Sequence, residues 1–219
     1  MRVFVSADPS ADAAAAIVRR LRAAIRQRGV ATIAVSGGST APALLEAIGG
    51  ALEAQPALAS ATTVWQVDER VAPAGDSARN ALQLAGLQCA VWLMPVDAID
   101  LRAAARRYAA SLPVIFDVVH LGVGDDGHTA SWPPDQPHIA GSARRVEITA
   151  PFNGLQRMTL TASVVNGARA RVILARGESK RPVLERWLGG ASDLQVGNVR
   201  RTGTAMFLDE LAAPGSSLP

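Results

Sequence analysis

Residues 114–131 read VIFDVVHLGVGDDGHTAS and join an apolar run to a glycine-rich polar segment. The apolar run at 114–123 predicts a central strand that is buried on both faces of a sheet. Glycines, two carboxylates and a histidine follow where that strand ends. Because ligands of parallel α/β sheets bind beyond the carboxyl ends of the strands, we expect a functional site in this segment.

Short β-branched runs alternate with longer amphipathic runs on both sides of this stretch. In the run at 11–28, Ile17, Leu21 and Ile25 recur every four residues and predict one apolar helix face. Further helices are expected at 42–52, 80–85, 99–111, 164–168 and 179–188, and strands at 3–6, 32–35, 62–67, 90–94, 145–148, 157–161, 170–175 and 204–208. The alternation predicts an α/β fold with a doubly wound, mostly parallel sheet and helices on both faces. We expect a single domain over 1–219, ending in a Gly-, Ser- and Pro-rich tail.

Composition narrows the class of protein. The net charge is +3, and Lys180 is the only lysine among the 22 basic residues. No basic run is interleaved with aromatic residues, so no nucleic-acid partner is expected. No apolar run reaches the roughly 18 residues of a membrane span, and the N-terminus reads as a strand rather than a secretory signal. The single cysteine, Cys89, allows no internal disulfide and no thiolate metal cluster, which fits a cytoplasmic protein.

The segment Ser36-Gly37-Gly38-Ser39-Thr40 joins the strand expected at 32–35 to the helix expected at 42–52. Its glycines let the backbone approach a ligand, the helix start offers free N–H groups, and the hydroxyls add donors, which together suit a phosphate. A tight turn in which Ser39 or Thr40 caps the helix fits these residues equally well. Nucleotide binding is not favoured, because no lysine follows the loop and the spaced glycines of a dinucleotide site are missing.

His128 is the candidate general base. Histidine has the side chain whose ordinary pKa lies nearest neutrality, so it can accept and return a proton at working pH. Asp126 could fix its tautomer; the alternative is that Asp126 caps a helix and His128 is incidental. No metal site is expected, because His120 falls in the buried strand as a hydrogen-bonded core residue and His138 lies in a proline-rich loop.

Three basic residues are candidates for anion binding. Arg70 ends the triplet Asp68-Glu69-Arg70 and could present a planar fork to a phosphate or carboxylate, with Asp68 orienting it or the substrate. Arg157 and Lys180 qualify by charge and position, and Lys180 stands out because the chain otherwise uses arginine. Each of the three could equally be a solvated surface charge.

Together these segments resemble the 6-phosphogluconolactonase family. The matching residues are 36–40, Trp65 through Asp68-Glu69-Arg70 to Pro73, 122–131, 157–161, Asn166, 177–180 and Phe207-Leu208-Asp209. The resemblance implies a parallel α/β fold shared with glucosamine-6-phosphate deaminases and isomerases. It also implies hydrolysis of 6-phospho-D-glucono-1,5-lactone to 6-phosphogluconate in the oxidative pentose phosphate pathway, without a metal or organic cofactor.

Carried over residue by residue, the resemblance implies roles for the candidates. His128 would activate a water molecule for direct attack on the lactone, with no acyl-enzyme. The catalytic group implied is His128, Asp126, Arg70 and Asp68. The phosphate-binding group implied is Gly37, Gly38, Ser39, Thr40, Arg70, Arg157 and Lys180.

Two segments depart from the family pattern. Trp132-Pro133-Pro134 stands where Leu-Phe-Pro is usual, and Arg79-Asn80 stands where Ser-Asn is usual, so the walls of the lactone pocket are expected to differ. The nearest rival function is a sugar-phosphate isomerase or deaminase on the same fold. Those families share a tyrosine where this chain has Arg70. They also share a glutamate shortly after the histidine, where this chain has Thr129-Ala130-Ser131.

A second rival, a non-catalytic sugar-phosphate-binding protein, would keep the pocket without the chemistry. The partner that we expect is a small phosphosugar lactone. We expect a monomer or a weak homodimer, with no membrane association.

Overall fold

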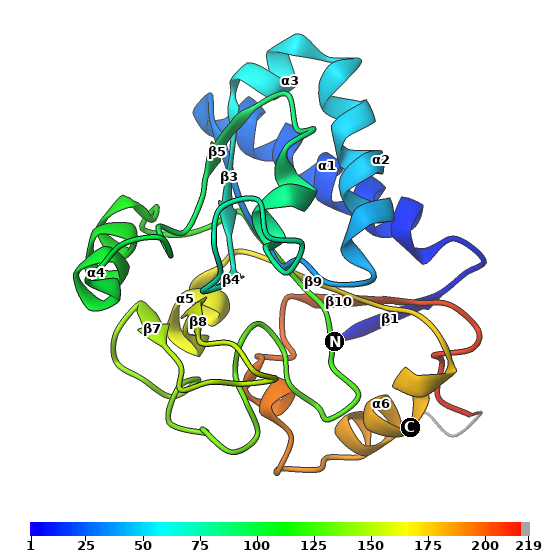
Figure 1. The fold of residues 1–219 in the computed structure, drawn as a ribbon. Helices are drawn as coiled ribbons and strands as arrows, with labels where there is room; N and C mark the ends of the chain where they lie inside the picture. Colours follow the sequence, from blue (N-terminus) through cyan, green and yellow to red (C-terminus); the bar gives the residue numbers. More distant parts are fainter. Residues whose placement is uncertain (216–219) are drawn as a thin grey trace.

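A seven-stranded sheet forms the centre of the protein, with the strand order β1-β10-β9-β6-β2-β3-β5 (Figure 1). The computed structural model describes residues 1–215, so positions 216–219 of the expected tail lie outside the described residues. All neighbouring strands of this sheet run parallel. The strands are β1 (Arg2–Val5), β2 (Ala31–Val35), β3 (Thr62–Gln66), β5 (Ala90–Trp92), β6 (Val118–Leu121), β9 (Arg171–Ala175) and β10 (Thr204–Leu208).

Helices cover both faces of the sheet. One face carries α1 (Pro9–Arg28), α2 (Ala41–Glu53) and α3 (Pro56–Ser60), and the other carries α4 (Leu101–Ser111), α5 (Ala162–Gly167) and α6 (Arg181–Leu188) (Figure 1). Along β6, Val118 points into the core under α1 and α2, whereas Val119 and Leu121 point into the core on the opposite face. A strand with both faces covered is the arrangement expected of a central parallel strand. The predicted α/β class, with a doubly wound and mostly parallel sheet, is therefore confirmed.

A second, three-stranded antiparallel sheet continues from the carboxyl end of β3. It consists of β4 (Asp68–Arg70), β8 (Arg157–Leu160) and β7 (Val146–Ile148), in the order β4-β8-β7. The sequence predicted β7 and β8 but left 68–70 open to being a solvated charged loop. That alternative is wrong, because Asp68 is 4% exposed and Glu69 is 0% exposed.

Several boundaries differ from those expected. The central strand begins at Val118 rather than at residue 114, because Val114 and Ile115 are exposed in an irregular segment before the sheet. The helix expected at 80–85 is a 3-10 helix, η1 (Asn80–Leu84), and the helix expected at 179–188 begins as a separate 3-10 turn, η2 (Glu178–Lys180). The short elements α3 and η3 (Gln195–Asn198) were not expected, because they are too short to show a periodic apolar pattern.

The strand order reverses between β2 and β6, which are neighbours in the sheet. The strand that follows β2 in the sequence, β3, lies on one side of this pair, whereas β9 lies on the other side, next to β6. Such a reversal leaves a crevice beyond the carboxyl ends of the two strands. The loop at 36–40 follows β2 and the loop at 122–131 follows β6, so both open into this crevice.

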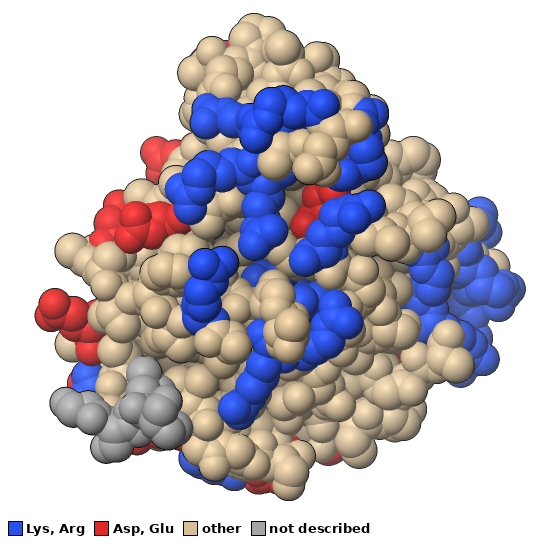
Figure 2. All heavy atoms as spheres, turned by 180° about the vertical axis from the view of Figure 1, so that it is seen from behind, with Lys and Arg blue, Asp and Glu red and all other residues tan. Residues whose placement is uncertain are grey.

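Basic side chains are spread over much of one face of the molecule (Figure 2). A positively charged surface raises the local concentration of anionic small molecules. Within the described residues, no helix is both long enough and apolar enough to cross a membrane.

Candidate active site

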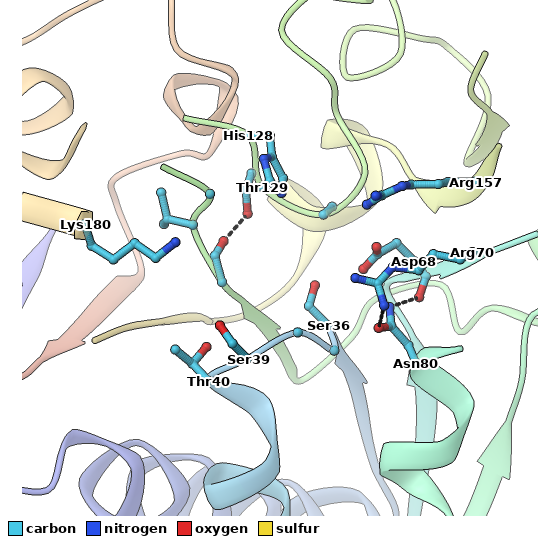
Figure 3. A pocket seen from close by; sticks show the side chains of 16 residues that line it. Ser36, Ser39, Thr40, Asp68, Arg70, Asn80, His128, Thr129, Arg157 and Lys180 are labelled. Atoms are coloured by element: carbon cyan, nitrogen blue, oxygen red, sulfur yellow. Dashed lines mark hydrogen bonds between the residues drawn. The ribbon is translucent and has the colours of Figure 1, made fainter. Parts of the chain in front are cut away.

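A pocket of about 170 Å³ lies at the reversal point of the strand order. The candidate residues that line it are Gly37, Gly38, Ser39, Thr40, Asp68, Arg70, His128, Arg157 and Lys180. Figure 3 shows Lys180 on one side of the pocket and Arg70 with Arg157 on the opposite side. The fold thus brings together residues that are far apart in the sequence.

The loop after β2 offers donors to the pocket. Thr40 occupies the N-cap position of α2, but its side chain makes no capping hydrogen bond. Thr40 therefore stands at the N-cap position, as the turn alternative expected, but its side chain does not form a cap. Its hydroxyl and the first N–H groups of α2 can instead bind an anion, and the positive end of the helix dipole favours one there.

Gly37 lets a second loop approach. A Cβ atom at this position would lie 2.2 Å from Oδ1 of Asn80, so a larger residue would push Asn80 away. Asn80 accepts a hydrogen bond at 2.6 Å from Nη1 of Arg70 and donates one at 3.0 Å to the carbonyl oxygen of Asp68. Arg70 also donates to the carbonyl oxygen of Ala78 at 2.8 Å. Its guanidinium is thereby held at the pocket wall.

Glu69, directly behind Arg70, organises the loop that carries Asn80. Its buried carboxylate accepts hydrogen bonds from the backbone N–H groups of Arg70, Asn80 and Ala81 and from the side-chain amide of Gln66, all between 2.7 and 2.8 Å. A buried charge is tolerated when it is hydrogen-bonded in this way. Sequence reasoning missed this role, because an acidic residue within three consecutive charges is usually solvent-exposed.

His128 is paired with Asp126. Nδ1 of its ring lies 2.5 Å from Oδ1 of Asp126, and its backbone N–H donates to the same oxygen at 3.0 Å. A carboxylate beside Nδ1 keeps the proton on that nitrogen and leaves Nε2 free to accept one. A Cβ at Gly124 would lie 2.1 Å from Nδ1, so this close approach requires glycine. No helix begins after Asp126, and the capping alternative is therefore wrong.

Arg157 is 7% exposed and lines the pocket. Within residues 1–215 its side chain makes no hydrogen bond, and its Nε atom is buried without a partner. Burial lowers the pKa of Arg157, and the negative charge of Asp68 partly offsets this effect. Asp68 itself accepts a hydrogen bond from the hydroxyl of Ser131 at 2.7 Å. A buried guanidinium that makes no hydrogen bond within the described residues is suited to binding an anion from the pocket.

Lys180 reaches the pocket from η2, where it pairs with Asp125 of the loop after β6 at 2.6 Å. Lys180 lowers the pKa of Asp125 through this contact. The two loops are therefore joined across the crevice.

His120 lies in the core beneath the pocket. It is buried as expected; within the described residues neither ring nitrogen has a partner of normal hydrogen-bond geometry, and a backbone contact with Ser36 is the polar neighbour that acts on its pKa. Burial lowers the pKa of His120 to about 4, which keeps the ring neutral near pH 7. In the described part of the chain, no group of three or more His, Cys, Asp and Glu side chains is arranged to hold a metal ion.

The family profile of glucosamine-6-phosphate isomerases/6-phosphogluconolactonase matches residues 6–206. The chain is 31% identical to the 6-phosphogluconolactonase of Streptomyces coelicolor, over 94% of this chain and 89% of the relative. The chain belongs to this family. The predicted resemblance to the 6-phosphogluconolactonases is thereby confirmed.

Solved structures of the family share the fold. The 6-phosphogluconolactonase from Trypanosoma cruzi superposes with a TM-score of 0.84 at 24% identity, over 99% of this chain and 97% of that one. A monomeric glucosamine-6-phosphate deaminase superposes with a TM-score of 0.80 at 15% identity, over 97% and 98% of the chains. The fold is therefore common to both activities of the family, and the site residues must distinguish them.

The residues that depart from the family pattern, Arg79 and Trp132-Pro133-Pro134, lie outside the pocket lining. Trp132 is fully buried, and its indole N–H donates to the carbonyl oxygen of Leu160 at 2.8 Å. The expectation that it alters the pocket wall is wrong, since it packs in the core under the sheet. Arg79 points away from the pocket to Asp97, at 2.9 Å, while Asn80 beside it lines the pocket.

Proposed function

We propose that this protein is a 6-phosphogluconolactonase, as its relatives are named, and that it hydrolyses 6-phospho-D-glucono-1,5-lactone to 6-phosphogluconate. The observation that carries the proposal is that His128, whose ring is paired with Asp126, lines the same pocket as three cationic side chains. A general base in a pocket that binds anions suits a substrate with two parts: an uncharged, activated ester group and an anionic phosphate. A cytoplasmic location and a place in the oxidative pentose phosphate pathway belong to this proposal.

In the proposed mechanism, Nε2 of His128 takes a proton from a water molecule as its oxygen attacks C1 of the lactone. The bond between C1 and the ring oxygen then breaks, and the imidazolium returns the proton to that oxygen. The new carboxylic acid ionises and releases one proton to solvent. Asp126 stabilises the imidazolium between these steps. General base help of this kind is worth about 10²- to 10⁴-fold in rate.

In this proposal the cationic side chains form the anion-binding site. Lys180, Arg70 and Arg157 hold the phosphate together with the hydroxyls of Ser39 and Thr40. Binding a remote phosphate orients the reacting carbonyl, so part of the binding free energy lowers the activation barrier. The anion-binding side chains come from different loops of the crevice, so the substrate would contact several of them at once.

Direct attack by water is favoured over an acyl-enzyme. A serine nucleophile needs a base within hydrogen-bond reach. Among the described residues, no serine donates to His128, and the hydroxyl of Ser131 is committed to Asp68.

The deaminase and isomerase alternative is less well supported by the residues after the histidine. Thr129 donates its hydroxyl to the carbonyl oxygen of Gly122 at 2.7 Å, and Ser131 bonds Asp68. Neither supplies the additional carboxylate that the rival families carry there. Arg70, where those families carry tyrosine, adds a charge suited to an anion.

The test is lactone hydrolysis, followed as acid release and compared with the spontaneous rate. Acceleration by the purified protein at micromolar concentration or below supports the proposal, and its absence would refute it. Glucosamine 6-phosphate, assayed for ammonia release, separates the deaminase alternative. A protein that binds 6-phosphogluconate without accelerating either reaction would be the non-catalytic alternative.

A further inference from the structure

The residues Phe152-Asn153-Gly154-Leu155 form the tip of the hairpin that joins β7 to β8. The backbone N–H of Phe152 donates to the carbonyl oxygen of Leu155 at 2.9 Å, and the reverse bond measures 3.4 Å. The φ angles are 51° at Asn153 and 81° at Gly154. Two successive positive φ angles mark a type I′ turn, and Asn-Gly is among the pairs that favour it most. The local sequence therefore specifies this turn.

The turn places the side chain of Phe152 against the active site. The centroid of its ring lies 5.2 Å from that of His128, with the two planes at 80°. Cζ of Arg157 lies over the same ring, 4.8 Å from the centroid. Perpendicular aromatic pairs and cations over ring faces both attract. One side chain thus contacts the proposed base and the guanidinium that has no hydrogen-bond partner.

Both of these neighbours need such a contact. Asp126 holds one nitrogen of the His128 ring, and a single hydrogen bond does not by itself set the tilt of the ring plane. The side chain of Arg157 makes no hydrogen bond within the described residues, so packing is what holds it. The ring of Phe152 is placed so that it can limit the tilt of the imidazole and support the guanidinium.

We propose that Phe152 is a positioning residue that aligns His128 for proton transfer and Arg157 for anion binding. The inference rests on the proposed lactonase function and deepens it. Phe152 has no group that can exchange a proton, so it acts through its two neighbours. The Asn153-Gly154 turn sets the place of the ring.

The first experiment compares Phe152→Leu with Phe152→Tyr in the lactone assay. Leucine keeps the bulk but loses the aromatic face, so we expect kcat to fall and KM to rise, by about 10- to 30-fold in kcat/KM. Tyrosine keeps the ring and should retain most of the activity. Wild-type kcat and KM in Phe152→Leu would overturn the inference, even if the thermal midpoint of unfolding changes.

A double variant separates the two contacts. In an Arg157→Ala background, Phe152→Leu should still lower kcat through His128 but should not raise KM further, because the guanidinium is already gone. If Phe152→Leu raised KM by the same factor in the Arg157→Ala background as in the wild type, Phe152 would not act through Arg157.

The third experiment leaves the pocket lining untouched. Gly154→Ala puts a Cβ at a φ of 81°, where it meets no atom within 4 Å, so the strain is confined to the turn. We expect kcat/KM to fall several-fold in this variant. Asn153→Gly, the matched control, accepts the positive φ and should keep wild-type kinetics. If Gly154→Ala had the same kcat/KM as Asn153→Gly, the turn would have no role in placing Phe152.

These outcomes are distinguishable from failure of the proposed function. If the wild-type protein does not accelerate lactone hydrolysis, the proposed function is refuted before any variant is compared. If the wild type is active and Phe152→Leu is equally active, the function stands and the positioning role is refuted.

Discussion

The ammonium group of Lys180 lies 2.6 Å from Oδ1 of Asp125, and the hydroxyl of Ser179 donates to the same oxygen at 3.1 Å. The two partners differ in exposure, since the side chain of Lys180 is 15% exposed and that of Asp125 is 63% exposed. An anion that binds Lys180 in the pocket must share it with this carboxylate. Asp125 therefore competes with the substrate for the charge of the lysine.

Replacing Asp125 by asparagine should strengthen substrate binding. The amide keeps an acceptor for Ser179 and Lys180 but removes the competing charge. We expect KM for the lactone to fall about 3-fold, because an exposed ion pair is worth no more than about 1 kcal/mol. The gain should shrink as salt is added, since salt screens exposed charges. A raised KM would show instead that Asp125 is needed to place the lysine.

His128→Ala should lower kcat by about 10²- to 10⁴-fold with a smaller change in KM, because the base acts on the water and not on the phosphate. Asp126→Asn should lower kcat by less, since the imidazole remains but loses the partner that fixes its tautomer. Steady-state kinetics of lactone hydrolysis provide the measurement.

His138→Ala is the control for these variants, because His138 is exposed in a loop outside the pocket. It should keep the kcat of the wild type. Full activity of His128→Ala would leave the enzyme assignment in place but would remove His128 as the base.

Arg70→Ala should chiefly raise KM, since it removes one cationic side chain from the anion-binding site. Arg70→Lys should restore little of the affinity, because one ammonium cannot bond Ala78 and Asn80 and also present a planar fork to the ligand. We expect KM to rise at least about 10-fold in both variants, as expected for a charged hydrogen bond of about 1.5 to 3 kcal/mol. An unchanged KM would exclude Arg70 from the anion site.

His120 should make folding stability fall in mild acid. Burial lowers its pKa from 6.5 to about 4, so between these values the unfolded chain binds a proton that the folded protein does not. The free energy of unfolding therefore rises with pH in this window and falls as the pH is lowered from 6.5 to 4. The loss from this one group is at most about 3 kcal/mol.

Urea unfolding at pH 7 and pH 5 measures this effect. His120→Gln should lose less stability between the two pH values than the wild type, whereas the exposed His138→Gln should behave as the wild type. An equal pH dependence in His120→Gln and wild type would show that His120 is not the group responsible.

The sequence predicted those parts of the fold and site that depend on local pattern. The loop after β6 could be assigned to the carboxyl end of a strand, because the apolar run and the glycines are adjacent in the sequence. The strand position at 114–115 was wrong, since exposure of Val114 and Ile115 depends on where the chain enters the sheet.

The parts that the sequence did not reveal depend on contacts between distant segments. The burial of the Glu69 carboxylate is compensated by three backbone N–H groups, two of which come from the 3-10 helix that begins at Asn80. Phe152 reaches His128 only through the pairing of β7 with β8. The Asn153-Gly154 pair was a signal for a hairpin, but no local pattern shows where its tip will lie.

The pocket carries cations on two opposite sides (Figure 3). The lactone has one anionic group, its phosphate, whereas the opened acid has a phosphate at one end and a carboxylate at the other. The three cations that hold the phosphate in the proposed complex can also attract the new carboxylate, so the cavity should hold the opened acid at least as tightly as the lactone. The product, 6-phosphogluconate, would then inhibit the enzyme at high conversion. The rate of hydrolysis would fall as this acid accumulates in the cell.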